Sequence, residues 1–196
     1  MIKICYTVSV VKIRQSQFPD ENQNTEKRIM KKFSTKQIAF CGLIAALYVV
    51  LTWILGEFGY GPIQFRFSEC MTVLPFCFPI ATAGLTIGCL LANLLSTVGP
   101  LDLILGTAAT LIGCIGTQLC RKKDLWWLAP LPPVVSNGLL IGLLLTIYSE
   151  TRTAAYFFTM AAQIGISELI CCYGLGLPVL LVFRHYQKKS NRGMTL

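Results

Sequence analysis

Long apolar runs, separated by short polar links, fill most of the sequence after residue 35. Residues 36–55 are mostly apolar, and about 20 residues suffice for one helix across a bilayer at about 1.5 Å per residue. Residues 100–120 and 126–148 form runs of similar length, and the last run, 154–183, is longer. The pattern therefore predicts an all-α integral membrane protein.

The apolar run between residues 71 and 98 is too long for one upright helix and too short for two complete spans with a turn. Pro75 and Pro79 indicate where it divides, because proline interrupts helical hydrogen bonding. We therefore predict a short helix near residues 68–78 and a full one near 80–98. This division gives a six-transmembrane-helix bundle whose second helix is short.

Clusters of basic residues favour the same topology. If the N-terminal cluster lies inside the cell, six spans also place residues 121–123 and the basic C-terminal tail inside, whereas five spans would place both outside. Cytoplasmic loops of membrane proteins carry an excess of Lys and Arg. We therefore expect the N- and C-termini to be cytoplasmic.

Helix breakers interrupt the last two spans. Pro130-Leu-Pro-Pro133 would kink or unwind the fifth span, and the sixth is long enough to be tilted or broken near Gly174–Pro178. Residues 1–29, in contrast, are a polar N-terminal extension that we expect to be dispensable or misassigned, which leaves residues 30–196 as a single six-helix membrane domain.

Composition narrows the function classes. The chain is 54% hydrophobic and 13% charged, compared with about 25% charged residues in soluble domains. Its net charge of +8 sits in clusters that flank apolar runs, so we expect no nucleic-acid partner. The nine cysteines follow no metal or disulfide spacing. No ATP-binding or catalytic motif occurs, and we expect neither an enzyme nor a cofactor or metal.

The segment Tyr60-Gly-Pro-Ile-Gln-Phe-Arg-Phe-Ser-Glu69 places two charges between membrane spans. Irregular backbone at membrane depth survives only where protein buries it or where it lines a polar cavity. We therefore predict that residues 56–70 form an outer loop that acts as a lid over a binding site. Arg66 and Gln64 are candidate ligand contacts, and the aromatic residues beside them could close over the ligand.

Other polar residues are candidates for the same site: Asp102 and Asn93 fall toward the outer side of the predicted bundle, and Glu168 and Asn137 fall within the membrane. Glu168 is the sharpest candidate, because an intramembrane carboxylate indicates a functional site by default, although it could instead be a structural partner of Arg66. Asn137 and Asn93 could contact ligand or only join helices. Asp102 could contact ligand or be a first-turn acid favoured by the helix dipole.

A stripe of small residues marks the first span. Ala39, Gly42 and Ala46 recur at helical spacing, and such stripes allow another helix to approach closely. The partner could be another helix of this protein or a separate subunit.

Several motifs together resemble the QueT family of bacterial membrane proteins. They are the segment 60–69, Thr72-Val-Leu-Pro75, Gly88-Cys-Leu-Leu-Ala-Asn-Leu-Leu-Ser96, Ala129-Pro-Leu-Pro-Pro133 with Asn137, and Glu168 with Gly174-Leu-Gly-Leu-Pro178. The similarity covers about residues 36–183. It implies the substrate-capturing S component of an energy-coupling factor (ECF) transporter, which binds a queuosine precursor such as 7-aminomethyl-7-deazaguanine or a related deazapurine at the bacterial plasma membrane.

The resemblance also implies partners. A separate transmembrane T component and two ATPase subunits would drive uptake, and Ala39, Gly42 and Ala46 would dock on the T component, although Gly42 stands where alanine is common. The site would bind the ring's N–H edge through Glu168 and its carbonyl through Asn137, Gln64 or Arg66. An aminomethyl cation would pair with Asp102 or Glu69, and the stacking candidates are Tyr60, Phe65 and Phe67.

Two alternatives to this function remain open. The first is an S component or stand-alone permease for another vitamin-like or nucleobase substrate, because a fold alone does not fix the ligand. The second is a structural membrane protein whose polar residues only hold helices together.

Overall fold

A computed structural model describes residues 34–54, 66–94 and 99–193. The chain divides into two compact units, Met1–Ile38 and Ala39–Leu196. Only residues 34–38 of the first unit are described, and they begin the first helix, so the predicted extension 1–29 lies outside the described residues. Most of the predicted outer loop, including Tyr60, Gln64 and Phe65, also lies outside them.

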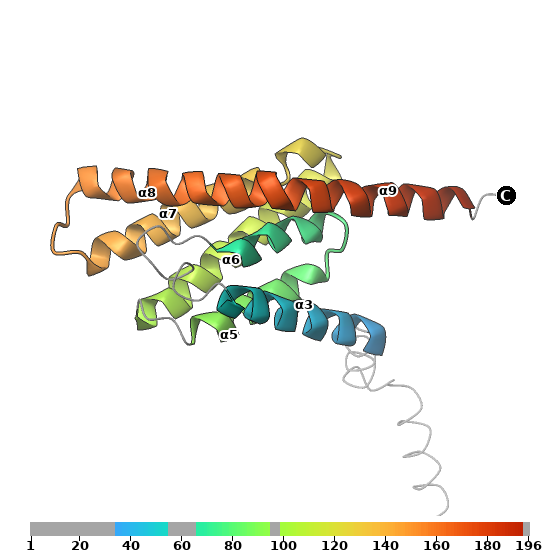
Figure 1. Ribbon diagram of the computed structural model, residues 1–196, viewed down its shortest axis with the longest axis horizontal. Coiled ribbons are helices and arrows are strands. Elements are labelled where there is room, and N and C mark those ends of the chain that lie inside the picture. Colours follow the sequence, from blue (N-terminus) through green and yellow to red (C-terminus); the bar gives the residue numbers. More distant parts are fainter. Residues whose placement is uncertain (1–33, 55–65, 95–98, 194–196) are drawn as a thin grey trace, which may run out of the picture. The chain divides into compact units, whose positions relative to one another are not determined.

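The described residues are helical throughout and contain no strand. Among these residues there are six α-helices and three shorter helical segments of 3₁₀ or π geometry (Figure 1). In chain order the elements are α3 (Thr35–Ile54), the 3₁₀ helix η1 (Phe67–Phe76), α5 (Ala81–Asn93), α6 (Pro100–Lys122), the 3₁₀ turn η2 (Trp126–Leu128), α7 (Leu131–Tyr148), α8 (Ala154–Leu169), the π-helix η3 (Ile170–Gly176) and α9 (Leu177–Gly193).

Four helical stretches are long and apolar enough to cross a membrane: Thr35–Ile54, Pro100–Lys122, Trp126–Tyr148 and Ala154–Gln187. Large apolar side chains such as Ile54 and Phe158 are exposed on them. A surface of this kind is stable in lipid and would aggregate in water. The prediction of an all-α membrane protein is therefore confirmed.

The short second helix lies where Pro75 and Pro79 placed it, but its geometry is unusual. The 3₁₀ helix η1 has 10 residues, whereas 3₁₀ runs longer than three or four residues are uncommon. Its residues Ser68, Glu69 and Thr72 are buried. Because η1 contacts α5, α6, α9 and η3, it carries polar side chains into the middle of the protein.

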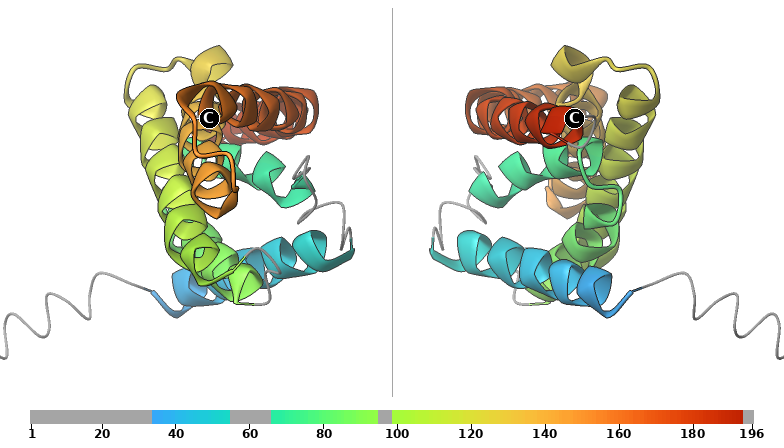
Figure 2. Two further views of the ribbon diagram at one scale, coloured as in Figure 1. Left: turned by 90° about the vertical axis from the view of Figure 1, so that its left-hand side faces the viewer. Right: turned by 90° about the vertical axis from the view of Figure 1, so that its right-hand side faces the viewer.

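The prolines between residues 130 and 133 separate two elements and do not kink one long helix. The chain turns at Ala129 and Pro130, between η2 and α7, at one end of α6 and α7 (Figure 2). Pro132 then occupies the first turn of α7, where no partner exists for a backbone N–H and proline is tolerated. The predicted unwinding is therefore found at the start of α7.

The sixth predicted span is a continuous rod of α8, η3 and α9 (Figure 1). The sequence predicts a span that is tilted or broken near Gly174–Pro178, and the structure has an unbroken rod in which a π-helix covers Ile170–Gly176. A π-helix keeps the rod continuous but changes the direction of the side chains that follow, and such segments are frequent at functional sites. Glu168 lies two residues before it.

Small residues bring α3 and α5 into close contact. A Cβ atom on Gly84 would lie 2.7 Å from the carbonyl oxygen of Cys41, and one on Gly88 would lie 2.9 Å from that of Ala45. Only glycine allows this approach of two backbones. The contact buries Tyr48 of α3, of which 1% is exposed, and points it toward η1.

Candidate functional site

Eight buried polar side chains, each less than a tenth exposed, form linked networks that we call the buried polar cluster. They come from α3, η1 and its preceding residue, α5, α6, α7 and α8, so no single helix carries the site. The members are Tyr48, Arg66, Glu69, Asn93, Asp102, Thr110, Asn137 and Glu168.

An ion pair between Arg66 and Asp102 anchors one part of the cluster. The Nη2 atom of Arg66 donates to both carboxylate oxygens of Asp102, at 3.0 and 3.4 Å. Its Nη1 atom donates to Oδ1 of Asn93 at 3.3 Å, and Asn93 Nδ2 donates to the backbone oxygen of Asp102 at 3.2 Å. Asn93 therefore joins α5 to α6, and Asp102 stands in the first turn of α6 while pairing with a buried guanidinium.

Glu69 occupies the centre of the cluster. Its Oε1 atom accepts hydrogen bonds from the hydroxyl of Tyr48 and, at 3.2 Å, from that of Thr110. Its Oε2 atom is buried and has no hydrogen-bond partner among the described residues. The backbone oxygen of Glu69 accepts from Thr72 Oγ1 at 2.6 Å, which fixes the residue in η1.

Glu168 faces the same interior and not the lipid. Of this residue 3% is exposed, and its carboxylate interacts with Asn137, with Glu69 and with Arg66. The Sγ atom of Cys172 bridges the two glutamates, because it lies 3.6 Å from Glu168 Oε2 and 3.5 Å from the backbone oxygen of Glu69. The intramembrane carboxylate and the segment around Arg66 are therefore neighbours.

Asn137 completes this side of the cluster. Its Nδ2 atom is buried and makes no hydrogen bond of good geometry within the described chain, although the side chain interacts with Glu168. A buried amide N–H without a partner costs about 1–3 kcal/mol. Together with Glu69 Oε2, it gives the cluster one unused donor and one unused acceptor.

The charges in the cluster do not balance. Three carboxylates, those of Glu69, Asp102 and Glu168, accompany the single guanidinium of Arg66. A buried charge is stable only when it is paired and hydrogen-bonded. The arrangement therefore suits a ligand that brings N–H donors or a positive charge.

The other residues predicted from the sequence are the aromatic and polar candidates of the outer loop and the docking residues of α3. Phe67 is half-buried at the start of η1. Tyr60, Gln64 and Phe65 lie outside the described residues. On α3 the predicted docking residues Ala39, Gly42 and Ala46 are all exposed, and a Cβ atom on Gly42 would meet nothing within 4 Å.

The sequence patterns did not reveal Tyr48, Thr110 or Cys172. Each lies in an apolar run, where a hydroxyl or thiol passes for a helix-packing residue. One available signal was that a buried tyrosine hydroxyl needs a partner, which predicts a polar neighbour opposite Tyr48.

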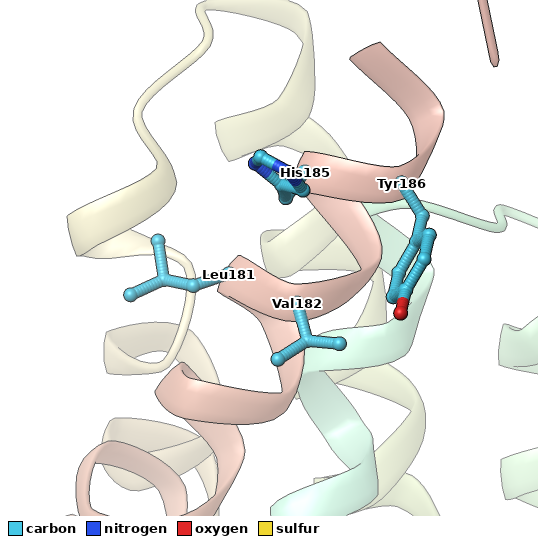
Figure 3. A pocket seen from close by; sticks show the side chains of 4 residues that line it. All are labelled: Leu181, Val182, His185 and Tyr186. Atoms are coloured by element: carbon cyan, nitrogen blue, oxygen red, sulfur yellow. The ribbon is translucent and has the colours of Figure 1, made fainter. Parts of the chain in front are cut away.

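Two pockets lie away from the buried polar cluster. One is lined by Leu181, Val182, His185 and Tyr186, which follow one another on a single face of α9 (Figure 3). The other lies between α6 and α7 and is lined mostly by apolar residues, among them Ile112, Pro132 and Leu139. Neither contains a member of the cluster, and both lie among exposed apolar side chains of the kind that face lipid.

Comparisons with known proteins point in one direction. A family model described as "QueT transporter" matches residues 38–185, which include every member of the buried polar cluster. The "Queuosine precursor transporter QueT" of Lactococcus lactis subsp. cremoris (strain MG1363) is 41% identical over 103 residues. That match covers 50% of this chain and 60% of the relative's length. No solved structure matches the chain.

Proposed function

The chain belongs to the QueT transporter family, and from this premise we propose that it is the substrate-capturing S component of an ECF transporter for a queuosine precursor. The ligand that we propose is 7-aminomethyl-7-deazaguanine or a related deazapurine, bound from outside the cell. The proposal includes six membrane spans with both termini in the cytoplasm, as the basic clusters indicate.

The observation that carries this proposal is the pairing of Glu168 with Asn137 inside the buried polar cluster. A deazaguanine presents two adjacent N–H donors, which one carboxylate can accept together, and beside them a carbonyl oxygen. Glu168 supplies the carboxylate. Asn137, whose Nδ2 atom makes no hydrogen bond of good geometry within the described residues, supplies a donor for the carbonyl beside it.

The structure also bears on the other candidates for the carbonyl. Arg66 already donates to Asp102 and Asn93, so using it for ligand would weaken a buried ion pair. Breaking such a pair costs about 3–5 kcal/mol. Asn137 is therefore our choice over Arg66. Gln64 and the stacking candidates Tyr60 and Phe65 lie outside the described residues and stay candidates, as does the half-buried Phe67.

The proposed partners follow from two features of the chain. The sequence contains no G-x-x-x-x-G-K-[ST] motif, so ATP hydrolysis would come from two separate ATPase subunits. The small-residue stripe Ala39, Gly42 and Ala46 is exposed, whereas the neighbouring face of α3, which contains Ala45, is packed against α5. An exposed stripe of this kind suits close docking of a helix from a T component.

Glu168→Gln tests the proposed site. The substitution keeps the shape of the side chain but replaces one acceptor oxygen by an N–H₂ group that faces the donors of the ligand. We expect the affinity for 7-aminomethyl-7-deazaguanine, measured by calorimetry on purified protein, to fall by about 100-fold, because charge-assisted hydrogen bonds in a buried site are strong.

Glu150→Gln is the matched control, because Glu150 is exposed in the link before α8 and should leave the affinity unchanged. Unchanged affinity in Glu168→Gln would refute the assignment. A parallel screen against purines and vitamins separates this function from transport of another small molecule, and a protein that binds none of them would be a structural one.

A further inference from the structure

We propose that Glu69 is the group that recognises a primary ammonium on the ligand, and that it thereby selects cationic deazaguanines over neutral ones. This inference rests on the proposed function. It adds a second recognition point to the site, distinct from the contact between Glu168 and the N–H edge of the ring. It also assigns Tyr48 and Thr110 as residues that position this second point.

Asp102 and Glu69 differ in whether their carboxylates are available to pair with an ammonium group. Both oxygens of Asp102 already accept from Arg66, so Asp102 has its countercharge within the protein. Glu69 forms no ion pair with a described residue, and 1% of it is exposed. Since Arg66 is already paired with Asp102, an ammonium group would give the buried Glu69 carboxylate an ion-pair partner of its own.

The two carboxylate oxygens of Glu69 have different surroundings. Oε1 is held by the hydroxyls of Tyr48 and Thr110, which approach from α3 and α6. Oε2 is just as buried and accepts nothing from the described residues. The carboxylate is thus fixed by one oxygen and presents the other, as a preorganised acceptor for a ligand does.

Glu69 and Glu168 lie close enough together to belong to one binding site. Cys172 touches the backbone oxygen of Glu69 and the carboxylate of Glu168, and the two glutamate side chains interact. One ligand can therefore reach both. Neighbouring carboxylates repel each other, and the nearby Arg66 forms its ion pair with Asp102, so a ligand with N–H donors at one end and an ammonium at the other would relieve this repulsion.

The main alternative is that Glu69 has only a structural role. In that case Glu69 only ties α3 to α6 through Tyr48 and Thr110. Its Oε2 atom would then be a buried polar atom without a hydrogen-bond partner among the described residues, which is unfavourable. A structural role therefore leaves the buried Oε2 atom unexplained, whereas recognition of an ammonium group gives this atom a partner.

The test compares 7-aminomethyl-7-deazaguanine with 7-methyl-7-deazaguanine, which lacks only the amino group. For each protein variant we take the ratio of the two dissociation constants, measured by calorimetry. We expect wild-type protein to prefer the amine by about 100-fold, since a buried charge pair contributes strongly to affinity. In Glu69→Gln the preference should fall below about 5-fold, while affinity for the methyl compound stays within about 3-fold of wild type.

Glu69→Gln is suited to this test because its side-chain oxygen can still accept from Tyr48 and Thr110, and its amide N–H₂ group stands where Oε2 was. Binding of the methyl compound shows that the variant is folded. If Glu69→Gln is not recovered as folded protein, Glu69→Asp withdraws the charge by one methylene and should lower the same ratio. Asp102→Asn tests the competing carboxylate, and Glu150→Gln, at an exposed residue outside the cluster, is the control that should leave the ratio at the wild-type value.

Three results would overturn the inference. They are a wild-type protein without preference for the amine, a Glu69→Gln variant that loses affinity equally for both compounds, and an Asp102→Asn variant that alone removes the preference. In each of these the proposed function survives, because deazaguanine still binds. If wild-type protein binds neither compound, the proposed function fails and the role of Glu69 fails with it.

Discussion

The contact between α3 and α5 makes Gly88→Ala an informative perturbation. A Cβ atom there would lie 2.9 Å from both the carbonyl oxygen of Ala45 and the Cβ atom of Tyr48. Ordinary contacts begin near 3.4 Å, so α3 would have to move away by about half an ångström. Overpacking of this kind costs about 1–3 kcal/mol, and the movement would also pull Tyr48 away from Glu69.

The assay for Gly88→Ala is thermal unfolding of the purified protein in one detergent. Gly42→Ala is the matched control on the other side of α3, because an added Cβ atom meets nothing within 4 Å there. Alanine favours a helix over glycine by about 1 kcal/mol, so this control should unfold at the same temperature as wild type or higher. Equal stability of Gly88→Ala and wild type, or a loss in Gly42→Ala, would refute the packing argument.

Three further variants test the ion pair and the docking surface. Asp102→Ala should destabilise the protein by about 3–5 kcal/mol, because it leaves the buried Arg66 without its ion-pair partner. In the same unfolding assay, the double variant Asp102→Leu with Arg66→Met should recover part of this loss, because it leaves no buried charge unpaired. An Asp102→Ala variant as stable as wild type would contradict the importance of this ion pair. Gly42→Leu should leave ligand affinity unchanged and abolish uptake in cells that supply an ECF module, because it fills the exposed stripe; uptake at the wild-type rate would show that this face does not dock.

The helices could be predicted from the sequence because lipid imposes a simple rule on length and polarity. The first predicted span, 36–55, agrees with Thr35–Ile54, and the division at Pro75 and Pro79 gave the short second helix. The 3₁₀ geometry of η1 and the π-helix of η3 could not be predicted in this way. They depend on how buried backbone is accommodated by neighbouring helices, and hydrophobic periodicity carries no information about that.

The site was predictable residue by residue but not as a set of contacts. Arg66, Asp102, Asn137 and Glu168 each attract attention, because a polar side chain in an apolar run needs a reason. Which of them pair is a different question. No pattern in the sequence indicates that Arg66 forms its ion pair with Asp102, 36 positions away, rather than with Glu168.

The distinction between Glu69 and Asp102 arises from the same limitation. Both were candidates for an ammonium, and only the three-dimensional contacts show that one carboxylate has a guanidinium partner while the other presents an unused oxygen. Tyr48 and Thr110, which hold Glu69, come from helices on either side of η1 along the chain. Their convergence is a property of the fold.

A competition experiment shows whether the buried polar cluster binds a deazaguanine through Glu168. Wild-type protein and Glu168→Gln would each be incubated with an equimolar mixture of deazapurines, purines and vitamins, and the compounds retained after gel filtration identified by mass spectrometry. We predict that wild type retains a deazaguanine and that Glu168→Gln retains at least about 10-fold less of it. Retention of a different class of compound by wild type, or equal retention of the deazaguanine by both proteins, would contradict the claim.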